Sequence, residues 1–398
     1  LGDLRGALAD NERVLAIYRA AGDERNIAIA LSELGFTYRQ LGDFARARPL
    51  YEESVARLEP LGDAVAENLA SSLHNLGALL RLINQPQAAL VALERAAALE
   101  ERVHGPDHPN MAIRHNITGL TYADLGDYGK AVELLRRALA ISEKALGPEH
   151  RVVATRLNNL ATTLLSLGQP AEALALSKRG LAIDEKVYGP VHMNVALRLN
   201  TTSVALRDMG RLDEALVYAE RALDVGRRAL GPEHNEVAVW LNNLAQIHRM
   251  RKREDLALPL FEQSLALTEK TLGPRHLRVA GGLNGLAATQ MALGRSDDAL
   301  TSLTRAIGIV AGNDRPETQW RVQAALRVVH ERRGDPQLSI FWGKQAINTV
   351  QQMRGRLVGM PPALQASFLN DKRALYVALA DQLVAAGRLA EAQEVLAM

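Results

Sequence analysis

The chain has 398 residues, of which 47% are hydrophobic and only 4% aromatic, so we expect a core built from Ala and Leu, which are strong helix formers. Its 47 Lys and Arg residues nearly balance its 45 Asp and Glu residues, which argues against a basic surface for nucleic acid. These residues include no cysteine, which excludes disulfides, thiolate metal sites and a cysteine nucleophile among them.

The N-terminal sequence carries no visible targeting segment. The chain opens at Leu1 instead of an initiator methionine, so we expect that the natural N-terminus lies upstream. No apolar run approaches the roughly 20 residues that span a bilayer. We therefore expect no membrane segment, and a cytoplasmic location is the working expectation.

A repeat of 42 residues dominates the sequence. The tetrapeptide Gly-Pro-x-His recurs at this step, starting at Gly105, Gly147, Gly189, Gly231 and Gly273. The same step separates an asparagine series, Asn116, Asn158, Asn200, Asn242 and Asn284. A fixed period of this length is typical of an array of stacked units, which grows without closing a single core.

Each repeat unit predicts a pair of helices. In a representative unit, the pattern places them at about residues 152–167 and 170–187. Pro170 suits the first turn of a helix, where its missing N–H costs nothing, and Gly189 can take the left-handed conformation that ends one. Small residues such as Gly180 fall where two helices must cross closely. One pair cannot bury its apolar face alone, so the units must stack.

The spacing within each unit resembles the tetratricopeptide repeat (TPR), most clearly in residues 125–131 and 209–215. The long period, together with Leu-Asn-Asn-Leu-Ala at 157–161 and 241–245, is similar to the repeats of kinesin light chains and many bacterial signalling proteins. The resemblance covers residues 1–314. It implies an all-α fold, a right-handed superhelical solenoid of about seven to eight helix-turn-helix repeats.

Two units depart from this pattern at the turn between their helices. Asn84 and Lys252 stand where the other units carry glycine. Because residues other than glycine rarely adopt a left-handed backbone, we expect these two turns to be looser.

The resemblance implies that the first helix of each pair lines the concave face of the array. Residues three, four, seven and eleven apart share a face of one helix, so Asn158 is expected on the same face as Thr162. Because the asparagine recurs once in each unit, the series would form a ladder of amides along the array. An amide can donate and accept, and in similar proteins such asparagines hold peptide segments. The predicted groove residues are Asn116, Asn158, Asn200, Asn242, Asn284, Thr162, Arg207, Gln246 and Arg249. The alternative is that the asparagines brace neighbouring helices.

The loop histidines do not predict a metal site. Zinc needs ring nitrogens about 2 Å from one ion, whereas equivalent points on stacked units lie at least about 8–10 Å apart. We expect these side chains to pack or hydrogen-bond within their loops. The series Arg114, Arg156 and Arg198 is expected to be solvated or to make contacts between repeats, instead of binding phosphate. No phosphate loop, His-Glu-x-x-His or Gly-x-Ser-x-Gly motif occurs, so no cofactor and no enzymatic activity is expected.

The last segment, residues 315–398, leaves the 42-residue period. Helices are expected at 316–333 and about 337–357, followed by a break at 359–362, and residues 387–392 restart the repeat pattern. The runs Phe-Trp-Gly-Lys-Gln-Ala-Ile-Asn from Phe341 and Leu-Gln-x-x-Phe-Leu from Leu364 resemble the segment that joins TPR arrays to CHAT domains, which are caspase-like peptidases. Such a peptidase uses a histidine and a cysteine, so its catalytic part would lie beyond Met398.

These features predict a non-catalytic scaffold that binds a protein or peptide in its groove. In the leading hypothesis it is the sensor or regulatory half of a TPR–CHAT protease, with the peptidase domain in cis. The alternative is a stand-alone adaptor that assembles signalling or transport complexes. Neither hypothesis involves direct binding of nucleic acid or of a membrane.

Overall fold

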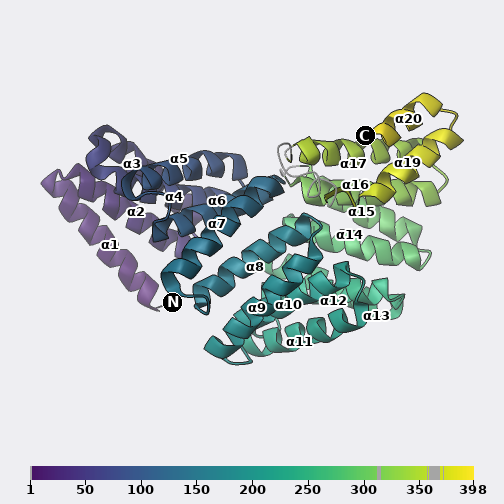
Figure 1. The fold of residues 1–398 in the computed structure, drawn as a ribbon, viewed down its shortest axis with the longest axis horizontal. Coiled ribbons are helices and arrows are strands. Elements are labelled where there is room, and N and C mark those ends of the chain that lie inside the picture. The colour runs from purple at the N-terminus through teal and green to yellow at the C-terminus, as the bar shows by residue number, and fades with distance from the viewer. Residues whose placement is uncertain (1, 312–314, 356, 358–367, 371) are drawn as a thin grey trace. The chain divides into compact units, whose positions relative to one another are not determined.

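The computed structural model describes residues 2–311, 315–355, 357, 368–370 and 372–398, and all regular elements within them are helices (Figure 1). The first part of the chain contains α1 (Gly2–Ala21), α2 (Glu24–Gln40), α3 (Phe44–Leu58), the short 3₁₀ helix η1 (Glu59–Val65), α4 (Ala66–Leu82), α5 (Pro86–His104), α6 (Pro109–Asp124) and α7 (Tyr128–Leu146). It continues with α8 (Arg151–Ser166), α9 (Pro170–Tyr188), α10 (Met193–Asp208), α11 (Leu212–Leu230), α12 (Asn235–Met250), α13 (Glu254–Leu272), α14 (Leu277–Ala292) and α15 (Ser296–Val310). The last helices are α16 (Pro316–Arg332), α17 (Pro336–Gly355), α19 (Arg373–Ala385) and α20 (Leu389–Ala397).

The helices form the expected pairs. The most extensive contacts join a first helix to the second helix that follows it, as in α4 with α5, α10 with α11 and α12 with α13. The pair expected at residues 152–167 and 170–187 is observed as α8 and α9, with each boundary within one residue. The all-α fold of repeated TPR helix pairs is therefore confirmed.

The helix pairs group into two compact units. Unit 1 contains residues 1–125 and 130–148, and unit 2 contains residues 126–129 and 149–398. Within each unit, neighbouring first helices touch one another, as in α2 with α4 and α8 with α10. In the described residues, no second helix makes extensive contacts with another second helix. The first helices therefore line the inner side of each stack, which is the side expected to carry the asparagines.

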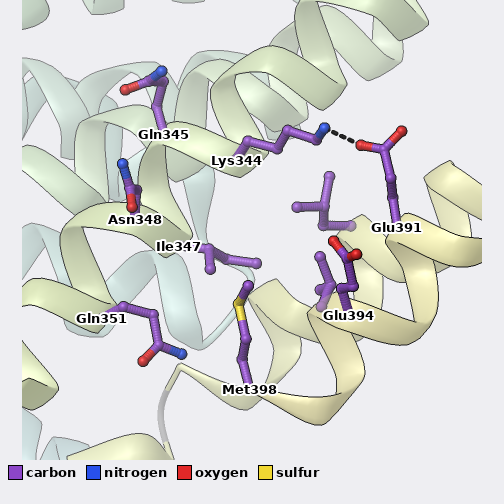
Figure 2. Close-up of a pocket in the computed structure, with 10 residues that line it drawn as sticks. Lys344, Gln345, Ile347, Asn348, Gln351, Glu391, Glu394 and Met398 are labelled. Carbon is purple, nitrogen blue, oxygen red and sulfur yellow. Dashed lines mark hydrogen bonds and ion pairs between the residues drawn. The ribbon is translucent and has the colours of Figure 1, made fainter.

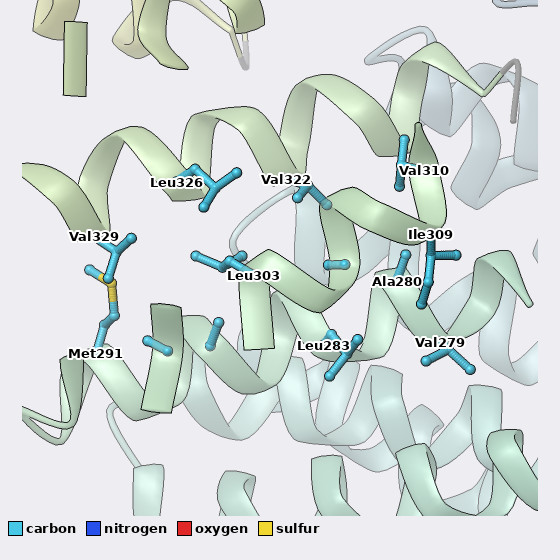
Figure 3. Packing of buried hydrophobic residues seen from close by; sticks show 13 residues of the cluster. Val279, Ala280, Leu283, Met291, Leu303, Ile309, Val310, Val322, Leu326 and Val329 are labelled. Atoms are coloured by element: carbon cyan, nitrogen blue, oxygen red, sulfur yellow. The ribbon is translucent and has the colours of Figure 1, made fainter. Parts of the chain in front are cut away.

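The core between pairs is aliphatic. In the cluster formed by α14, α15 and α16, Leu283, Leu303, Val322 and Leu326 point toward one another (Figure 3) and are at most 3% exposed. Burying one such side chain is worth about 1.5–3 kcal/mol. The clusters repeat from pair to pair, so each pair depends on its neighbours for burial.

Small residues sit at the helix crossings, as expected. A Cβ atom on Gly77 would lie 2.5 Å from Cγ of Leu93, and one on Gly119 would lie 3.1 Å from the Ala131 carbonyl oxygen. At Gly180 the nearest atom would be 3.5 Å away, an ordinary contact. Gly77 therefore permits a close crossing, whereas Gly180 tolerates a larger residue.

The Gly-Pro-x-His motif ends one helix and begins the next. Its glycines have positive φ, between 77° and 86°. In each copy the histidine Nδ1 accepts a hydrogen bond from the backbone N–H two residues later, at 3.1–3.3 Å. The expectation that these histidines hydrogen-bond within the loop is confirmed, because each acts as the N-cap of a first helix. The described residues contain no cluster of three or more possible metal ligands.

The turns at Asn84 and Lys252 are not looser than the others, contrary to expectation. Asn84 has φ 62° and Lys252 has φ 59°, which is the left-handed region that glycine occupies in the other turns. The Lys252 N–H donates to the Arg249 carbonyl at 3.0 Å, matching the 3.0 Å bond from Gly168 to Leu165. Packing of the two helices imposes the left-handed turn geometry, although this backbone conformation is unfavourable for a residue with a Cβ atom.

Replacing Lys252 with glycine is expected to stabilise unit 2 by about 1 kcal/mol. The left-handed conformation costs a residue with a Cβ atom about 1–2 kcal/mol, and the greater freedom of glycine in the unfolded chain offsets part of that gain. Urea denaturation followed by circular dichroism measures the change. The variant Gly168→Lys is the reverse control, and equal stability of Lys252→Gly and the wild type would contradict the prediction.

The C-terminal segment also forms helices where expected. The helices predicted at 316–333 and 337–357 are observed as α16 and α17, and the turn at Gly387 leads into α20. The expected break at 359–362 lies outside the described residues. Within the described part of the chain, none of the helices combines the length and apolar character needed to cross a bilayer.

Candidate functional site

Four of the five ladder asparagines lie on the inner side of unit 2. We define the ladder face as the inner face of α8, α10, α12 and α14, which carries Asn158, Asn200, Asn242 and Asn284 in turn. All four side chains are half-buried. The fifth, Asn116, lies on α6 in unit 1 and is 9% exposed.

The amide oxygens of the ladder face brace adjacent repeats. Oδ1 of Asn158 accepts a hydrogen bond from the Thr201 hydroxyl at 2.9 Å, and Oδ1 of Asn200 accepts one from the Asn243 amide at 2.7 Å. In both cases the donor lies 43 residues later, on the next first helix. The bracing hypothesis therefore describes what the oxygen of each of these amides does.

The amide nitrogens of the same residues are free. Among the described residues no acceptor pairs with Nδ2 of Asn158, Asn200, Asn242 or Asn284. None of these nitrogens is buried without a partner, so each can donate to water or to a ligand. The ladder face thus presents N–H donors at successive repeats.

The bracing stops at α12. Asn242 Oδ1 is buried and has no hydrogen-bond partner in the described chain. The residue 43 positions later is Gly285, which has no side chain to donate. Glycine is needed there because a Cβ atom would lie 2.4 Å from Cε1 of Phe261. Packing of the phenyl ring between α13 and α14 has therefore removed the polar link between α12 and α14 at this level.

The remaining predicted groove residues differ in how far they are already paired. Thr162 donates to carbonyl oxygens of its own helix, at 3.0 Å from both Asn158 and Asn159. Arg207 donates to Asp208 at 2.7 Å and to Gln246 at 2.8 Å. The structure therefore brings Arg207 and Gln246 together across a repeat boundary.

Arg249, on the ladder face, has no hydrogen bond or ion pair with a side chain in the described ranges. Its Nε is buried and forms no hydrogen bond with any described residue. Burial, followed by the positive charge of Arg207, lowers the pKa of Arg249, and the negative charge of Glu254 opposes this shift. Arg81, which occupies the same repeat position in unit 1, instead pairs with Asp124 at 2.7 Å.

Two members of the Arg114 series form buried ion pairs within the array. Arg114 contacts Glu100 at 2.9 Å, and Arg198 contacts Asp184 at 3.0 Å, with all four side chains at most 8% exposed. Their charges are satisfied inside the protein, as expected for contacts between repeats. Arg156 is half-buried, and its Nε has no hydrogen-bond partner in the described part of the chain.

Replacing Glu100 with glutamine is expected to cost about 3 kcal/mol at neutral pH, because it leaves the Arg114 charge buried without a carboxylate. Burial raises the pKa of Glu100, but hydrogen bonds from Asn110 and Arg114 outweigh it, so the pKa is lowered. A carboxylate with a lowered pKa stabilises the fold above its unfolded-state pKa, and this contribution disappears as the pH falls through the folded-state pKa. The difference between variant and wild type should therefore shrink in acid. Chemical denaturation from pH 7 to pH 3 tests this, and a constant difference would contradict it.

A separate hollow near the C-terminus was not predicted from the sequence. It has a volume of about 280 Å³ and lies between α17 and α20, lined by Ile347, Val395 and Met398 among others (Figure 2). Lys344 and Glu391 form an ion pair across its rim. The sequence analysis also missed the bracing donors Thr201 and Asn243. Their signal is a polar residue one position after the ladder asparagine in the next repeat.

Comparison with known proteins agrees with the repeat architecture. A family model described as tetratricopeptide repeat matches residues 1–59, 26–101, 68–144, 115–186, 199–270 and 236–311, and a second model with the same description matches residues 374–398. No curated protein matches the chain.

Two solved structures with TM-scores above 0.5 share the fold, and a third is similar over part of the chain. A Rap protein complexed with Competence and Sporulation Factor is similar with a TM-score of 0.61 and 13% identity, over 90% of this chain and 99% of that one. The apo form of RapI has a TM-score of 0.55 and 14% identity, over 72% of this chain and 99% of that one. The nearly identical TPR-like repeats of a candidate kinesin light chain from Podosopora anserina have a TM-score of 0.45 and 25% identity, over 52% and 98% of the two chains.

Proposed function

Because the chain belongs to the tetratricopeptide repeat family and is a protein-binding scaffold, we propose that unit 2 binds an extended segment of a partner protein along the ladder face. The observation that carries this proposal is that the oxygen and the nitrogen of one ladder amide are available for different partners. The oxygens of Asn158 and Asn200 hold the next repeat, while their nitrogens remain free to donate. Bracing and ligand binding are therefore compatible roles of one side chain.

An extended peptide suits these donors. Consecutive carbonyl oxygens of a strand point to opposite edges, so those on one edge recur about every 7 Å, close to the spacing of about 8–10 Å between adjacent helices. The ladder would therefore contact about every second carbonyl of the ligand. Such contacts involve the backbone, so they hold a segment without specifying its sequence.

Variants that separate the two roles test this proposal. Aspartate in place of Asn158 and Asn200 keeps an oxygen for bracing and removes the N–H donor. Thr201→Val with Asn243→Leu removes the bracing donors and leaves the asparagines unchanged. We would select ligands from a displayed library of random 12-residue peptides on the wild-type chain and measure their affinities by fluorescence polarisation.

We expect the aspartate variant to lose about 5-fold to 150-fold in affinity, since a hydrogen bond is worth about 0.5–1.5 kcal/mol and two are removed. The bracing variant should bind within about threefold of the wild type, provided that its circular dichroism spectrum is unchanged. Unchanged binding by the aspartate variant, or failure of the wild type to select any peptide, would overturn the proposal.

We also propose that binding at the ladder face regulates a CHAT peptidase domain encoded downstream of Met398. This proposal is supported by the resemblance of the runs at 341–348 and 364–369 to the segment that precedes such domains. A histidine and a cysteine in an α/β domain, encoded in the same reading frame, are expected. In the intact protein, deletion of residues 336–398 should uncouple ligand binding from cleavage. A stop codon after Met398 would instead favour the stand-alone adaptor.

A further inference from the structure

The first helix α14 carries several features that weaken a helix, and they gather in its N-terminal half, residues 277–285. This half contains Gly281, Gly282 and Gly285, whereas α8, α10 and α12 contain no glycine. Each glycine inside a helix makes the helical state about fivefold less favourable than alanine does, because glycine loses more backbone freedom. The helical conformation of this half therefore depends on its surroundings.

Packing does not require two of these glycines. A Cβ atom on Gly281 would have no neighbouring atom within 4 Å, and one on Gly282 would lie 3.8 Å from Cδ1 of Leu265, which is an ordinary contact. Alanine would therefore fit at both positions. Glycine here lowers the stability of the helix without permitting a closer packing.

The core contacts of the same half lack one large side chain. Val279 and Leu283 belong to the aliphatic cluster (Figure 3) and are at most 3% exposed. Their counterparts in α10 and α12 are also buried. Gly282, however, occupies the repeat position of Arg198 and Trp240, whose buried side chains anchor α10 and α12. This half of α14 therefore has one buried side chain fewer than its counterparts.

The polar links from this half to α12 are also weak. Thr201 and Asn243, each one position after a ladder asparagine, donate to the preceding first helix. Gly285 occupies the same position in α14 and has no side chain to donate. Among the described residues, Arg278 contacts Glu236 of α12 at 2.9 Å, but both side chains are partly exposed, and such pairs contribute little to stability.

The N-cap of α14 requires a neutral histidine. Nδ1 of His276 accepts a hydrogen bond from the Arg278 backbone N–H at 3.1 Å, and a protonated Nδ1 could not accept it. A protonated imidazole would also place a positive charge at a helix N-terminus, where it is unfavourable. Partial burial, followed by the positive charge of Arg278, lowers the pKa of His276.

The charges around His276 do not favour its protonation. Arg278 lies on the same helix, and Arg275 precedes His276 in the loop. Arg305 of α15 reaches this loop, where it donates to a backbone carbonyl at 3.3 Å, and it is paired with Glu269 of α13 at 2.6 Å. The carboxylate nearest to the loop in these contacts is thus already compensated by a guanidinium.

The cap of α10 has different surroundings. His192 also accepts from a backbone N–H through Nδ1, but its ring stacks on Tyr188 at 4.1 Å. The buried Asp184 and His192 interact electrostatically, and His192 favours the charged form of the carboxyl. Because this attraction is mutual, a protonated His192 has a carboxylate beside it. The helix α10 therefore serves as an internal reference for α14.

We infer that the N-terminal half of α14 is a pH-sensitive opening segment, which unfolds locally when His276 is protonated. A histidine in an unfolded segment has its ordinary pKa of about 6.5, and the pKa of His276 is lower in the closed helix. Below about pH 6.5 the open segment therefore binds protons that the closed segment excludes, so opening becomes more favourable as the pH falls. Opening would withdraw Asn284 from the ladder face, and only this consequence rests on the proposed function.

Hydrogen exchange of the full chain at pH 7 and pH 5 tests the inference. Protection factors, which correct for the intrinsic effect of pH on exchange, are compared between residues 278–285 of α14 and the equivalent residues 194–201 of α10. The variant His276→Asn keeps a capping acceptor that does not titrate. His192→Asn is the matched control on α10. Gly281→Ala strengthens the helix and leaves its cap unchanged.

At pH 7 we expect residues 278–285 to be less protected than residues 194–201. At pH 5 the protection of residues 278–285 should fall about fivefold, the scale of a lost N-cap, while that of residues 194–201 changes less than twofold. His276→Asn should remove this pH dependence, and His192→Asn should leave it in place. Gly281→Ala should raise the protection of α14 about fivefold at both pH values.

Equal protection of the two helices at pH 7 would show that α14 is not an opening segment. An equal loss in both helices at pH 5, or an undiminished loss in His276→Asn, would refute the role of His276. None of these measurements uses a ligand, so a failure of peptide binding at the ladder face and a failure of this inference are distinguishable.

Discussion

Replacing Arg198 with alanine is expected to destabilise unit 2 by about 3–5 kcal/mol, because it leaves the Asp184 carboxylate buried without its cation. Asp184 has no exposed surface and lies 3.0 Å from Arg198, whose side chain is 3% exposed. Burial raises the pKa of Asp184 even with Arg198 and His192 favouring the charged form. The pair is thus costly to bury and more costly to break.

The protonation of Asp184 gives the Arg198→Ala prediction a pH signature. Without Arg198 the pKa of Asp184 should rise further, so the folded variant binds a proton that the unfolded chain releases. Stability of the variant should therefore increase as the pH falls toward the unfolded-state pKa of aspartate, and the loss relative to the wild type should shrink.

Urea denaturation at pH 7 and pH 5, with hydrogen exchange of α9 and α10, measures the effect of Arg198→Ala. The matched control is Arg221→Ala, which breaks the exposed pair between Arg221 and Glu185 and should cost no more than about 1 kcal/mol. Equal losses in the two variants would show that burial of the Asp184–Arg198 pair contributes nothing to stability.

The sequence alone was sufficient for the features that depend on local pattern. The 42-residue period predicted the helix pairs, and α8 and α9 begin and end within one residue of the expected positions. The hydrogen bonds of the loop histidines were expected in the same way, because each bond spans two residues. These features repeat because the same contacts between residues close in sequence form them in every unit.

Features that depend on the partner repeat could not be predicted from one unit. Lys252 adopts a left-handed turn because the packing of α12 and α13 requires it, against the preference of the residue. Asn242 loses its bracing partner because Phe261 demands glycine at position 285. Both outcomes are set by side chains from other helices, which a pattern within one helix does not encode.

Replacing Gly226 with alanine is expected to destabilise unit 2 by about 3 kcal/mol, the upper end of overpacking costs. The added Cβ would lie 1.6 Å from Cζ3 of Trp240, whose side chain is 1% exposed, so the indole ring or the two helices must move. Gly308→Ala is the control, because Gly308 also lies within a second helix but has no atom within 4 Å of an added Cβ. That change should stabilise by about 0.5–1 kcal/mol. Destabilisation of similar size in both variants would contradict the prediction.

Gly226 and Trp240 occupy the repeat positions of Asp184 and Arg198, each 42 residues later. The same positions carry Glu100 and Arg114 in unit 1. The array fills this crossing with an acid and an arginine in two repeats and with glycine and tryptophan in one, while other repeats carry Ser142 with Arg156 and Thr268 with Gly282. An aspartate placed against tryptophan would clash, and an arginine placed against glycine would lack a carboxylate. The indole N–H of Trp240 also lacks a hydrogen-bond partner among the described residues, so the aromatic solution has its own cost.

The exchange Gly226→Asp with Trp240→Arg should therefore be more stable than either single variant. Gly226→Asp places a carboxylate against the indole ring, and Trp240→Arg leaves a cavity around an unpaired guanidinium. Together they recreate the arrangement of Asp184 and Arg198. A double-mutant cycle by urea denaturation should give a favourable coupling of about 2–3 kcal/mol, near the upper end for residues in contact. Additive single effects would show that the two positions do not act as a unit, and that the choice at this crossing depends on residues beyond the pair.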